Sequence, residues 1–196
     1  RENPIRRIIV DSYQSVSGTG GGAIAELQNQ IQAGLNGQEL ANSIYPHPIA
    51  FNVFPHIEPF MEDGYTREEF KMRGETKKIL HAPDMAISAT CVRVPVNVSH
   101  SEAVHIEFDH PMSPEEAREL LAAFPGVSVV DDPAANSYPT PLQAEGRDEV
   151  LVGRIRRDTS NPNGLAMWVV GDNLRKGAAL NAIQIAEEAV SRGLTR

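Results

Sequence analysis

The chain has 196 residues, of which 41% are hydrophobic and 22% charged, a composition typical of one globular domain and unlike that of a disordered or fibrous chain. Its 26 acidic and 18 basic residues give a net charge of −8, which disfavours a broad nucleic-acid-binding or membrane-binding surface. The single cysteine, Cys91, excludes an internal disulfide and a zinc–cysteine cluster, and we predict no metal site. Because no segment resembles a membrane helix or a signal peptide, we predict a cytoplasmic protein.

The first part of the chain predicts a strand, a loop and a helix. The β-branched residues 7–10 are typical of a strand, and the Ser- and Gly-rich stretch 11–22 is typical of a loop. We predict a helix over residues 23–31, because apolar residues recur there at the spacing of one helical face. These apolar residues are Ile24, Leu27 and Ile31.

Residues 34–59 predict a long irregular segment, which we call the excursion. Its prolines disfavour any regular element, and they are Pro46, Pro48, Pro55 and Pro59. Together with the residue that follows, it carries more apolar area than a solvated loop should, in the side chains of Ile44, Tyr45, Ile49, Phe51, Val53, Phe54, Ile57 and Phe60. Such a patch favours a contact surface. The alternative is that these side chains fold back onto the chain's own sheet.

Two capping boxes predict the next helices. Thr66 followed by Glu69 predicts a helix over residues 67–80. Ser113 followed by Glu116, with a proline at the first helical position, predicts a second helix, which a Pro-Gly pair ends.

The remaining segments predict strands and a last helix. Residues 103–109 alternate between apolar and polar side chains, which is typical of a half-buried antiparallel strand. Further strands are predicted over residues 87–98, 127–130, 150–156 and 165–170, and a helix over about 174–191. This order of elements predicts an α+β fold with a mixed, mostly antiparallel sheet and helices packed on one face.

The glycine-rich stretch Gly18 to Ala23 has the G-x-G-x-x-A form of a dinucleotide fingerprint, with Glu39 near the expected distance along the chain. Residues 11–17 separate it from the predicted strand, however, and prolines occupy the place of a second parallel strand. We therefore favour a flexible loop at a helix start over a Rossmann turn. Its backbone N–H groups would still suit an anion or a cofactor amide.

Several blocks of the sequence closely resemble aspartate-β-semialdehyde dehydrogenases, and they occur in the order of that family. They are residues 13–20 (YQSVSGTG), 68–71 (EEFK), 75–79 (ETKKI), 89–96 (ATCVRVPV) with His100, and 171–179 (GDNLRKGAA). The resemblance implies the dimerisation-domain fold of semialdehyde dehydrogenases, formed by residues 1–170. It also implies that residues 171–196 form a helix that packs on a coenzyme domain.

Two features of the family are not found in this sequence: a nucleotide-binding Rossmann domain, and an Asn-Cys-Ser/Thr segment with the nucleophilic cysteine. Cys91 lies in the middle of a predicted strand between apolar neighbours, which is typical of a small buried core residue. The resemblance therefore implies the catalytic and dimerisation half of the enzyme, inactive by itself.

The implied reaction interconverts aspartyl 4-phosphate and aspartate 4-semialdehyde with NADP and phosphate, in lysine, methionine and threonine biosynthesis. The NADP site would be incomplete in this chain. Two alternatives stay open. One is an N-acetyl-γ-glutamyl-phosphate reductase domain, and the other is a dimerisation module without catalysis.

Three residues are candidates for the chemistry. An imidazole titrates near neutral pH, and the resemblance makes His100 the general acid/base, although a lone histidine is more often structural. Arg93, on a β-branched strand, needs a carboxylate from the protein or a ligand, and the resemblance makes it the clamp on the substrate carboxylate. Gln14 would hold a carboxylate or orient the thioester, or else only stabilise a turn.

Glu68 and Lys71 lie on one face of the predicted helix, whereas the capping box occupies Glu69. The resemblance implies that Lys71 binds phosphate and Glu68 the substrate ammonium; the alternative is a solvated salt bridge. It also implies that Ser17, Gly18 and Asn173 contact NADP. Without the resemblance, Asn173 reads as a helix N-cap.

We also predict a twofold homodimer, formed through the sheet and the excursion. The apolar side chains of the excursion favour a dimer, and the resemblance implies that this half of the enzyme forms the subunit interface. Some of these side chains could instead face the coenzyme half.

Overall fold

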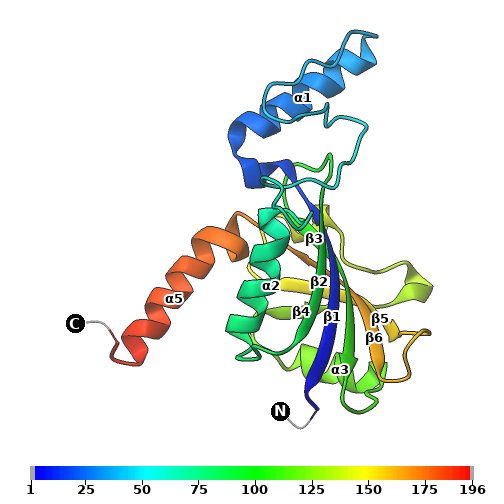
Figure 1. Ribbon diagram of the computed structural model, residues 1–196, viewed down its shortest axis with the longest axis vertical. Coiled ribbons are helices and arrows are strands. Elements are labelled where there is room, and N and C mark those ends of the chain that lie inside the picture. Colours follow the sequence, from blue (N-terminus) through cyan, green and yellow to red (C-terminus); the bar gives the residue numbers. More distant parts are fainter. Residues whose placement is uncertain (1–2, 195–196) are drawn as a thin grey trace.

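The computed structural model describes residues 3–194, and a six-stranded sheet forms its centre (Figure 1). The order across the sheet is β2-β1-β3-β6-β5-β4. The strands are β1 (Ile5–Gln14), β2 (Ala86–Arg93), β3 (His100–Phe108), β4 (Val127–Val129), β5 (Val150–Arg157) and β6 (Gly164–Gly171). The helices of eight or more residues are α1 (Gly21–Leu35), α2 (Arg67–Ile79), α3 (Pro114–Ala122) and α5 (Leu180–Ser191), and α4 (Pro141–Ala144) is a single turn.

The sheet is mixed, as the order of elements predicts. β1 pairs with β2 in parallel, β4 pairs with β5 in parallel, and the three remaining pairs, β1–β3, β3–β6 and β5–β6, are antiparallel. The prediction of an α+β fold with a mostly antiparallel sheet is therefore confirmed.

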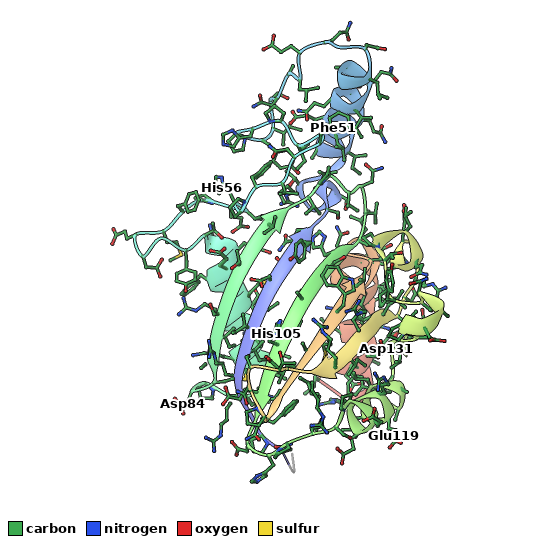
Figure 2. The ribbon with its side chains drawn as sticks, turned by 90° about the vertical axis from the view of Figure 1, so that its right-hand side faces the viewer. Phe51, His56, Asp84, His105, Glu119 and Asp131 are labelled. Carbon is green, nitrogen blue, oxygen red and sulfur yellow. The ribbon has the colours of Figure 1, made fainter. Side chains whose placement is uncertain are left out.

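The main core lies on the face of the sheet that α2 and α3 cover. Val104 and Phe108 of β3 pack there with Met72 of α2 and Ala117 of α3, while Ile106 packs against the edge of the same cluster. The alternation predicted for this strand is thus confirmed. Of the helices within residues 3–194, the short α4 packs on the opposite face, where Ala144 contacts Leu151 and Val170 near one corner. Figure 2 looks onto this more open face, with His105 near its middle.

Two strand boundaries differ from the sequence expectation. Residues 11–14, expected in a loop, continue β1, because β2 pairs with all four of them and β3 pairs with residues 11–13. The loop is also partly helical, with a 3-10 turn over Val16–Thr19. Conversely, the β-rich run 87–98 stops at Arg93, and the chain turns through Ser99, with a φ of 77°, into β3. His100 therefore begins a strand.

Helix α1 and the excursion stand together above the sheet and form a second, smaller core (Figure 1). Its buried residues are Val16, Ala23, Leu27, Tyr45, Ile49, Ala50 and Phe54. The excursion is irregular, as predicted, but three of the eight apolar side chains named above, Tyr45, Ile49 and Phe54, fold back into the core shared with α1, and Ile57 is buried outside that cluster. Ile44, Phe51, Val53 and Phe60 stay exposed.

The buried face of α1 agrees only in part with the one that the apolar spacing predicts: Leu27 is buried and Ile24 packs against the second core, but the face is rotated away from Ile31. Ile31 is 36% exposed, whereas Glu26 and Gln30 are buried. The polar pair is buried because it binds the backbone of the excursion. Glu26 accepts hydrogen bonds from the N–H groups of Ser43 and Ile44, and Gln30 accepts two from residues 49 and 50. Burial alone would raise the pKa of Glu26, but these hydrogen bonds outweigh burial and lower it.

The C-terminal segment stands off to the side of the sheet (Figure 1). A π-helical turn, Arg175–Ala179, leads into α5, so the predicted helix over 174–191 forms with an altered first turn. Ile183, Ile185 and Val190 are all more than half exposed. The packing of this C-terminal segment on a coenzyme domain stays a prediction. Among residues 3–194, no helix is long and apolar enough to cross a membrane.

Because Glu26 fastens the excursion to α1, we expect Glu26→Gln to weaken that attachment. A neutral amide accepts weaker hydrogen bonds than a carboxylate, so hydrogen exchange at the Ser43 and Ile44 amides should accelerate. In the wild type the two amides should stay protected at every pH above the ordinary pKa of a glutamate. The protection should be lost as the pH falls through the lowered pKa of Glu26, where the carboxylate becomes protonated. The control is the exposed Gln28→Ala. Equal exchange in all three proteins would contradict this role.

Candidate functional site

A cleft of about 860 Å³ opens where β1, β2 and β3 meet the excursion and the start of α2. Six of the residues selected from the sequence line it: Gln14, Gly18, Glu68, Lys71, Arg93 and His100. The structure therefore brings together most of the predicted site. Ser17 and Asn173 do not line it, but they bond to each other, and Asn173 bonds to Ser15 beside His100.

Strand register explains why three of these side chains meet. Gln14 is directly opposite Arg93 at the end of β1 and β2. On its other side Tyr13 pairs with Ser101, which places His100 next to Gln14 on β3. Cross-strand neighbours point to the same face, so one row across three strands presents an amide, a guanidinium and an imidazole.

His100 is held by the backbone of Ser15. The Ser15 N–H lies 3.1 Å from Nδ1 of His100, and the Ser15 hydroxyl oxygen lies 3.0 Å from the same nitrogen. Burial, followed by the nearby charge of Arg93, lowers the pKa of His100 to about 4, and the Ser99 carbonyl and the carboxylates of Glu68 and Asp172 act weakly in the opposite direction. The imidazole is therefore neutral at physiological pH.

Arg93 is a buried cation, with 5% of its surface exposed. Its Nη1 donates to the Ser15 carbonyl at 2.5 Å, and its guanidinium lies over the Tyr45 ring, 5.6 Å from the centroid. Its Nε has no hydrogen-bond partner among the described residues. Desolvation lowers the pKa of Arg93. Since no carboxylate of residues 3–194 pairs with it, the ligand alternative fits the structure.

Glu68 links Gln14 to Lys71. Its two oxygens accept from Gln14 Nε2 at 3.2 Å and from Lys71 Nζ at 2.7 Å. Burial would raise the pKa of Glu68, but the hydrogen bonds from Lys71 and Gln14 outweigh it and lower the pKa. Lys71 also lies 3.3 Å from Glu58 of the excursion, which the sequence did not single out. The face shared by Glu68 and Lys71 is thus turned toward the cleft.

Glu69 points away from the cleft and has a structural task. One oxygen completes the capping box with the Thr66 N–H, and the other accepts the N–H of Cys91 on β2. Glu69 thereby fastens α2 to the sheet. This separates it from Glu68, as helix geometry predicts.

Cys91 is a core residue. It is fully buried, and its sulfur lies 3.2 Å from the sulfur of Met72. Desolvation raises the pKa of its thiol to about 11. Such a thiol is a poor nucleophile at neutral pH.

Asn173 does not cap a helix. Its Oδ1 accepts from the Ser99 N–H at 2.9 Å and from the hydroxyls of Ser15 and Ser17, each at 3.2 Å, while its Nδ2 donates to Ser17 at 2.9 Å. The preceding residue, Asp172, caps the helical turn instead: its side chain accepts hydrogen bonds from the backbone N–H groups of Leu174 and Arg175. Asn173 also lines a smaller cavity of about 290 Å³ that His100 borders.

Sequence reasoning missed Ser15, Tyr45 and Asp172. Ser15 and Asp172 lie inside blocks that it quoted, but their side chains act through burial and backbone contacts that a pattern does not show. Tyr45 was counted only as an apolar residue of the excursion. Its ring against Arg93 depends on how the excursion folds back.

A mixed sheet whose strand ends present a buried cation, an imidazole and a Glu–Lys pair in one cleft defines an α+β domain built to bind a charged small molecule. Comparison with known families gives a more particular answer. The model of the semialdehyde dehydrogenase dimerisation domain matches residues 2–176. The chain belongs to this family, and the semialdehyde dehydrogenase type of fold expected from the sequence is confirmed.

Relatives and solved structures agree with that assignment. The aspartate-semialdehyde dehydrogenase of Aquifex aeolicus is 56% identical over 97% of this chain and 56% of its own length. A crystal structure of aspartate semialdehyde dehydrogenase II from Vibrio cholerae, complexed with ASA, superposes with a TM-score of 0.92 at 46% identity, covering 95% of this chain and 55% of that one. The Candida albicans enzyme with NADP has a TM-score of 0.71 at 25% identity, covering 98% and 52%. The chain thus spans about half the length of the relatives it matches.

The geometry of Cys91 predicts an unreactive thiol. A pKa of about 11 against an ordinary 9.0 reduces the thiolate fraction about a hundredfold at neutral pH, and burial blocks access further. We expect a thiol reagent to label the native chain at least about a hundredfold more slowly than the urea-unfolded chain. Labelling at similar rates would show that Cys91 is accessible.

Proposed function

We propose that this chain is the catalytic and dimerisation half of an aspartate-semialdehyde dehydrogenase, which interconverts aspartyl 4-phosphate and aspartate 4-semialdehyde with NADP and phosphate. The observation that carries the proposal is the single cleft in which Arg93, Glu68, Lys71 and His100 meet. Its two cations and one carboxylate are complementary to an amino acid whose side chain ends in an acyl phosphate or an aldehyde. The biosynthesis of lysine, methionine and threonine, in the cytoplasm, is the setting that the family implies.

Arg93 is the group for the substrate α-carboxylate. It is buried, and within residues 3–194 no carboxylate pairs with it and its Nε has no hydrogen-bond partner. A guanidinium fork offers a carboxylate two parallel hydrogen bonds, which recovers the cost of keeping the cation out of water. The Tyr45 ring holds the guanidinium in place.

Glu68 and Lys71 divide the remaining charges between them. The Glu68 carboxylate, held ionised by its neighbours, suits the substrate ammonium, and the Lys71 ammonium suits phosphate. Gln14, the last residue of β1, donates to Glu68 and orients the acyl group. Glu68 also favours aspartate over the N-acetylated rival substrate, because an acetylated nitrogen carries no charge for this carboxylate to bind.

His100 is the proton-handling group beside the reacting carbon. The thiolate that forms the covalent intermediate comes from the family's Asn-Cys segment, since Cys91 is buried away from the cleft. Alone, therefore, the 196-residue chain is expected not to turn over substrate. A dimerisation module without catalysis would not need the charged cleft.

The residues proposed for NADP fit one edge of a cofactor site. Open space lies over Gly20 and Gly21, and the first turn of α1 has no acidic residue to repel a phosphate or amide oxygen. Gly18 brings the backbone against His100, and Asn173 keeps one Nδ2 hydrogen beyond its bond to Ser17. NADP, when bound, gives or takes the hydride, and these residues would position it.

The substrate clamp is tested by Arg93→Lys in the full-length enzyme that contains this chain. A point charge cannot reproduce a two-pronged grip, so KM for aspartate semialdehyde should rise about tenfold or more, with a smaller change in kcat. Arg192→Lys, in an exposed pair with Glu188, is the matched control. An unchanged KM would remove Arg93 from substrate binding and leave the proposed function without its main support.

We also propose a twofold homodimer, in keeping with the dimerisation-domain family. No long helix of residues 3–194 covers the open face of the sheet (Figure 2), and Phe51, Val53 and Phe60 of the excursion region are each more than half exposed. Phe54 cannot be part of this surface because it is buried in the second core.

Sedimentation at micromolar concentration measures the assembly directly. We expect twice the 21.4 kDa chain mass, and a shift toward the monomer when Phe51 and Val53 are both changed to Asp. Ile79→Asp, exposed at the end of α2, should leave the dimer intact. A wild-type monomer at this concentration argues against the proposal.

A further inference from the structure

We propose that Glu102 is a cofactor-binding residue: its carboxyl group accepts a hydrogen bond from the carboxamide NH2 of the nicotinamide, while Asn173 donates one to the carboxamide oxygen. The inference rests on the proposed function, because it takes NADP as the cofactor. Glu102 adds a second group, with the opposite hydrogen-bonding sense, to the residues already assigned to NADP.

The smaller cavity, of about 290 Å³, adjoins the substrate cleft, since His100 forms part of the wall of both. Val150 and Val169 give it apolar surface, and Gly171 and Gly177 present no side chain to it. A cofactor ring that exchanges a hydride with a substrate must contact that substrate. This cavity therefore suits the nicotinamide, with apolar side chains for the ring and polar ones for its substituent.

Asn173 offers this cavity a donor. The backbone N–H of Ser99 can only donate, and it lies 2.9 Å from Oδ1 of Asn173, which fixes the orientation of the side-chain amide. The hydroxyls of Ser15 and Ser17 lie 3.2 Å from the same oxygen. One Nδ2 hydrogen bonds to Ser17, and the second has no partner within residues 3–194. Asn173 can therefore bind the oxygen of a carboxamide but not its NH2 group.

The described residues bring two carboxyl groups to the cavity, those of Glu102 and Asp172. Both oxygens of Asp172 accept backbone N–H groups, one from Gly146 and the other from Leu174 and Arg175. Within residues 3–194, by contrast, no hydrogen bond or ion pair reaches the carboxyl group of Glu102. Glu102 is therefore the acceptor that remains for the NH2 group.

The register of the sheet places Glu102 at the boundary between the cavity and the main core. It lies two residues after His100 on β3, and alternate residues of a strand share one face of the sheet. On β6 it is paired with Val169, which also lines the cavity. Val104, the next residue on the same face, belongs to the main core. The carboxyl group is thus held by a rigid strand and not by a loop.

Within the described chain no cation balances this carboxyl group. Lys176 lines the same cavity, but its Nζ donates to the side-chain oxygen of Gln184 at 2.6 Å. Burial raises the pKa of Glu102, and no neighbouring group offsets that effect. A hydrogen bond from a ligand N–H would recover part of the cost of burying the carboxylate. Glu102 and Asn173 together present an acceptor and a donor to one planar amide.

Equilibrium binding to the full-length enzyme that contains this chain tests the assignment. The probes are NADP and its 3-acetylpyridine analogue, in which a methyl group replaces the NH2 of the carboxamide and the C=O remains. We expect the wild type to bind NADP about tenfold or more tightly than the analogue, since a hydrogen bond to a charged acceptor contributes about that much. Glu102→Met, which has no acceptor of comparable strength, should lose this preference.

Three further variants complete the test. Asn173→Ala should weaken the binding of both probes alike, because both keep the carbonyl oxygen. Glu119→Met, at an exposed position of α3, is the matched control and should keep the wild-type preference. Glu102→Gln retains the shape of the side chain but accepts a weaker hydrogen bond, so it should reduce the preference, and it replaces Glu102→Met if that variant does not fold.

Two kinds of failure can be told apart. Tight NADP binding with an undiminished preference in the folded Glu102 variants, or with no preference in the wild type, overturns this inference and leaves the proposed function intact. A full-length enzyme without affinity for NADP contradicts the proposed function as well.

Discussion

The contacts of Ser15 are those on which the rest of the site depends. Its N–H faces His100, its carbonyl binds Arg93, and its side chain reaches Asn173. These partners come from three different parts of the chain, and one residue contacts all of them through its N–H, its carbonyl and its hydroxyl. Two of the three contacts are made by the backbone, so they depend on where β1 ends and not on the side chain at position 15.

The sequence was most informative about the fold where a local rule determines the structure. The capping boxes before α2 and α3 and the alternation in β3 depend on neighbours within a few residues, and all were confirmed. The extension of β1 and the buried face of α1 depend on distant partners instead. Polar residues such as Glu26 lie inside because the excursion returns its N–H groups to them, and periodicity cannot reveal that.

The candidate site shows the same division. Helix geometry separated Glu68 from Glu69, and the structure gives the two carboxylates different tasks. Composition alone could not choose His100 among six histidines; the family blocks did. Ser15 and Tyr45 gave no signal, since their importance comes from contacts made only after strands and excursion have come together.

Electrostatics ties these parts together. Arg93 is a cation held out of water without a carboxylate of the described chain to balance it, and its charge helps to keep His100 neutral. An anionic ligand in the cleft would therefore give this buried guanidinium a partner of opposite charge. Its arrival would also weaken the repulsion that lowers the pKa of His100, while the Ser15 N–H would still oppose a proton on Nδ1. The charge of Arg93 thus couples the binding of an anion to the pKa of His100. The Ser15 N–H limits this coupling, because it opposes a proton on Nδ1 whether or not the anion is bound.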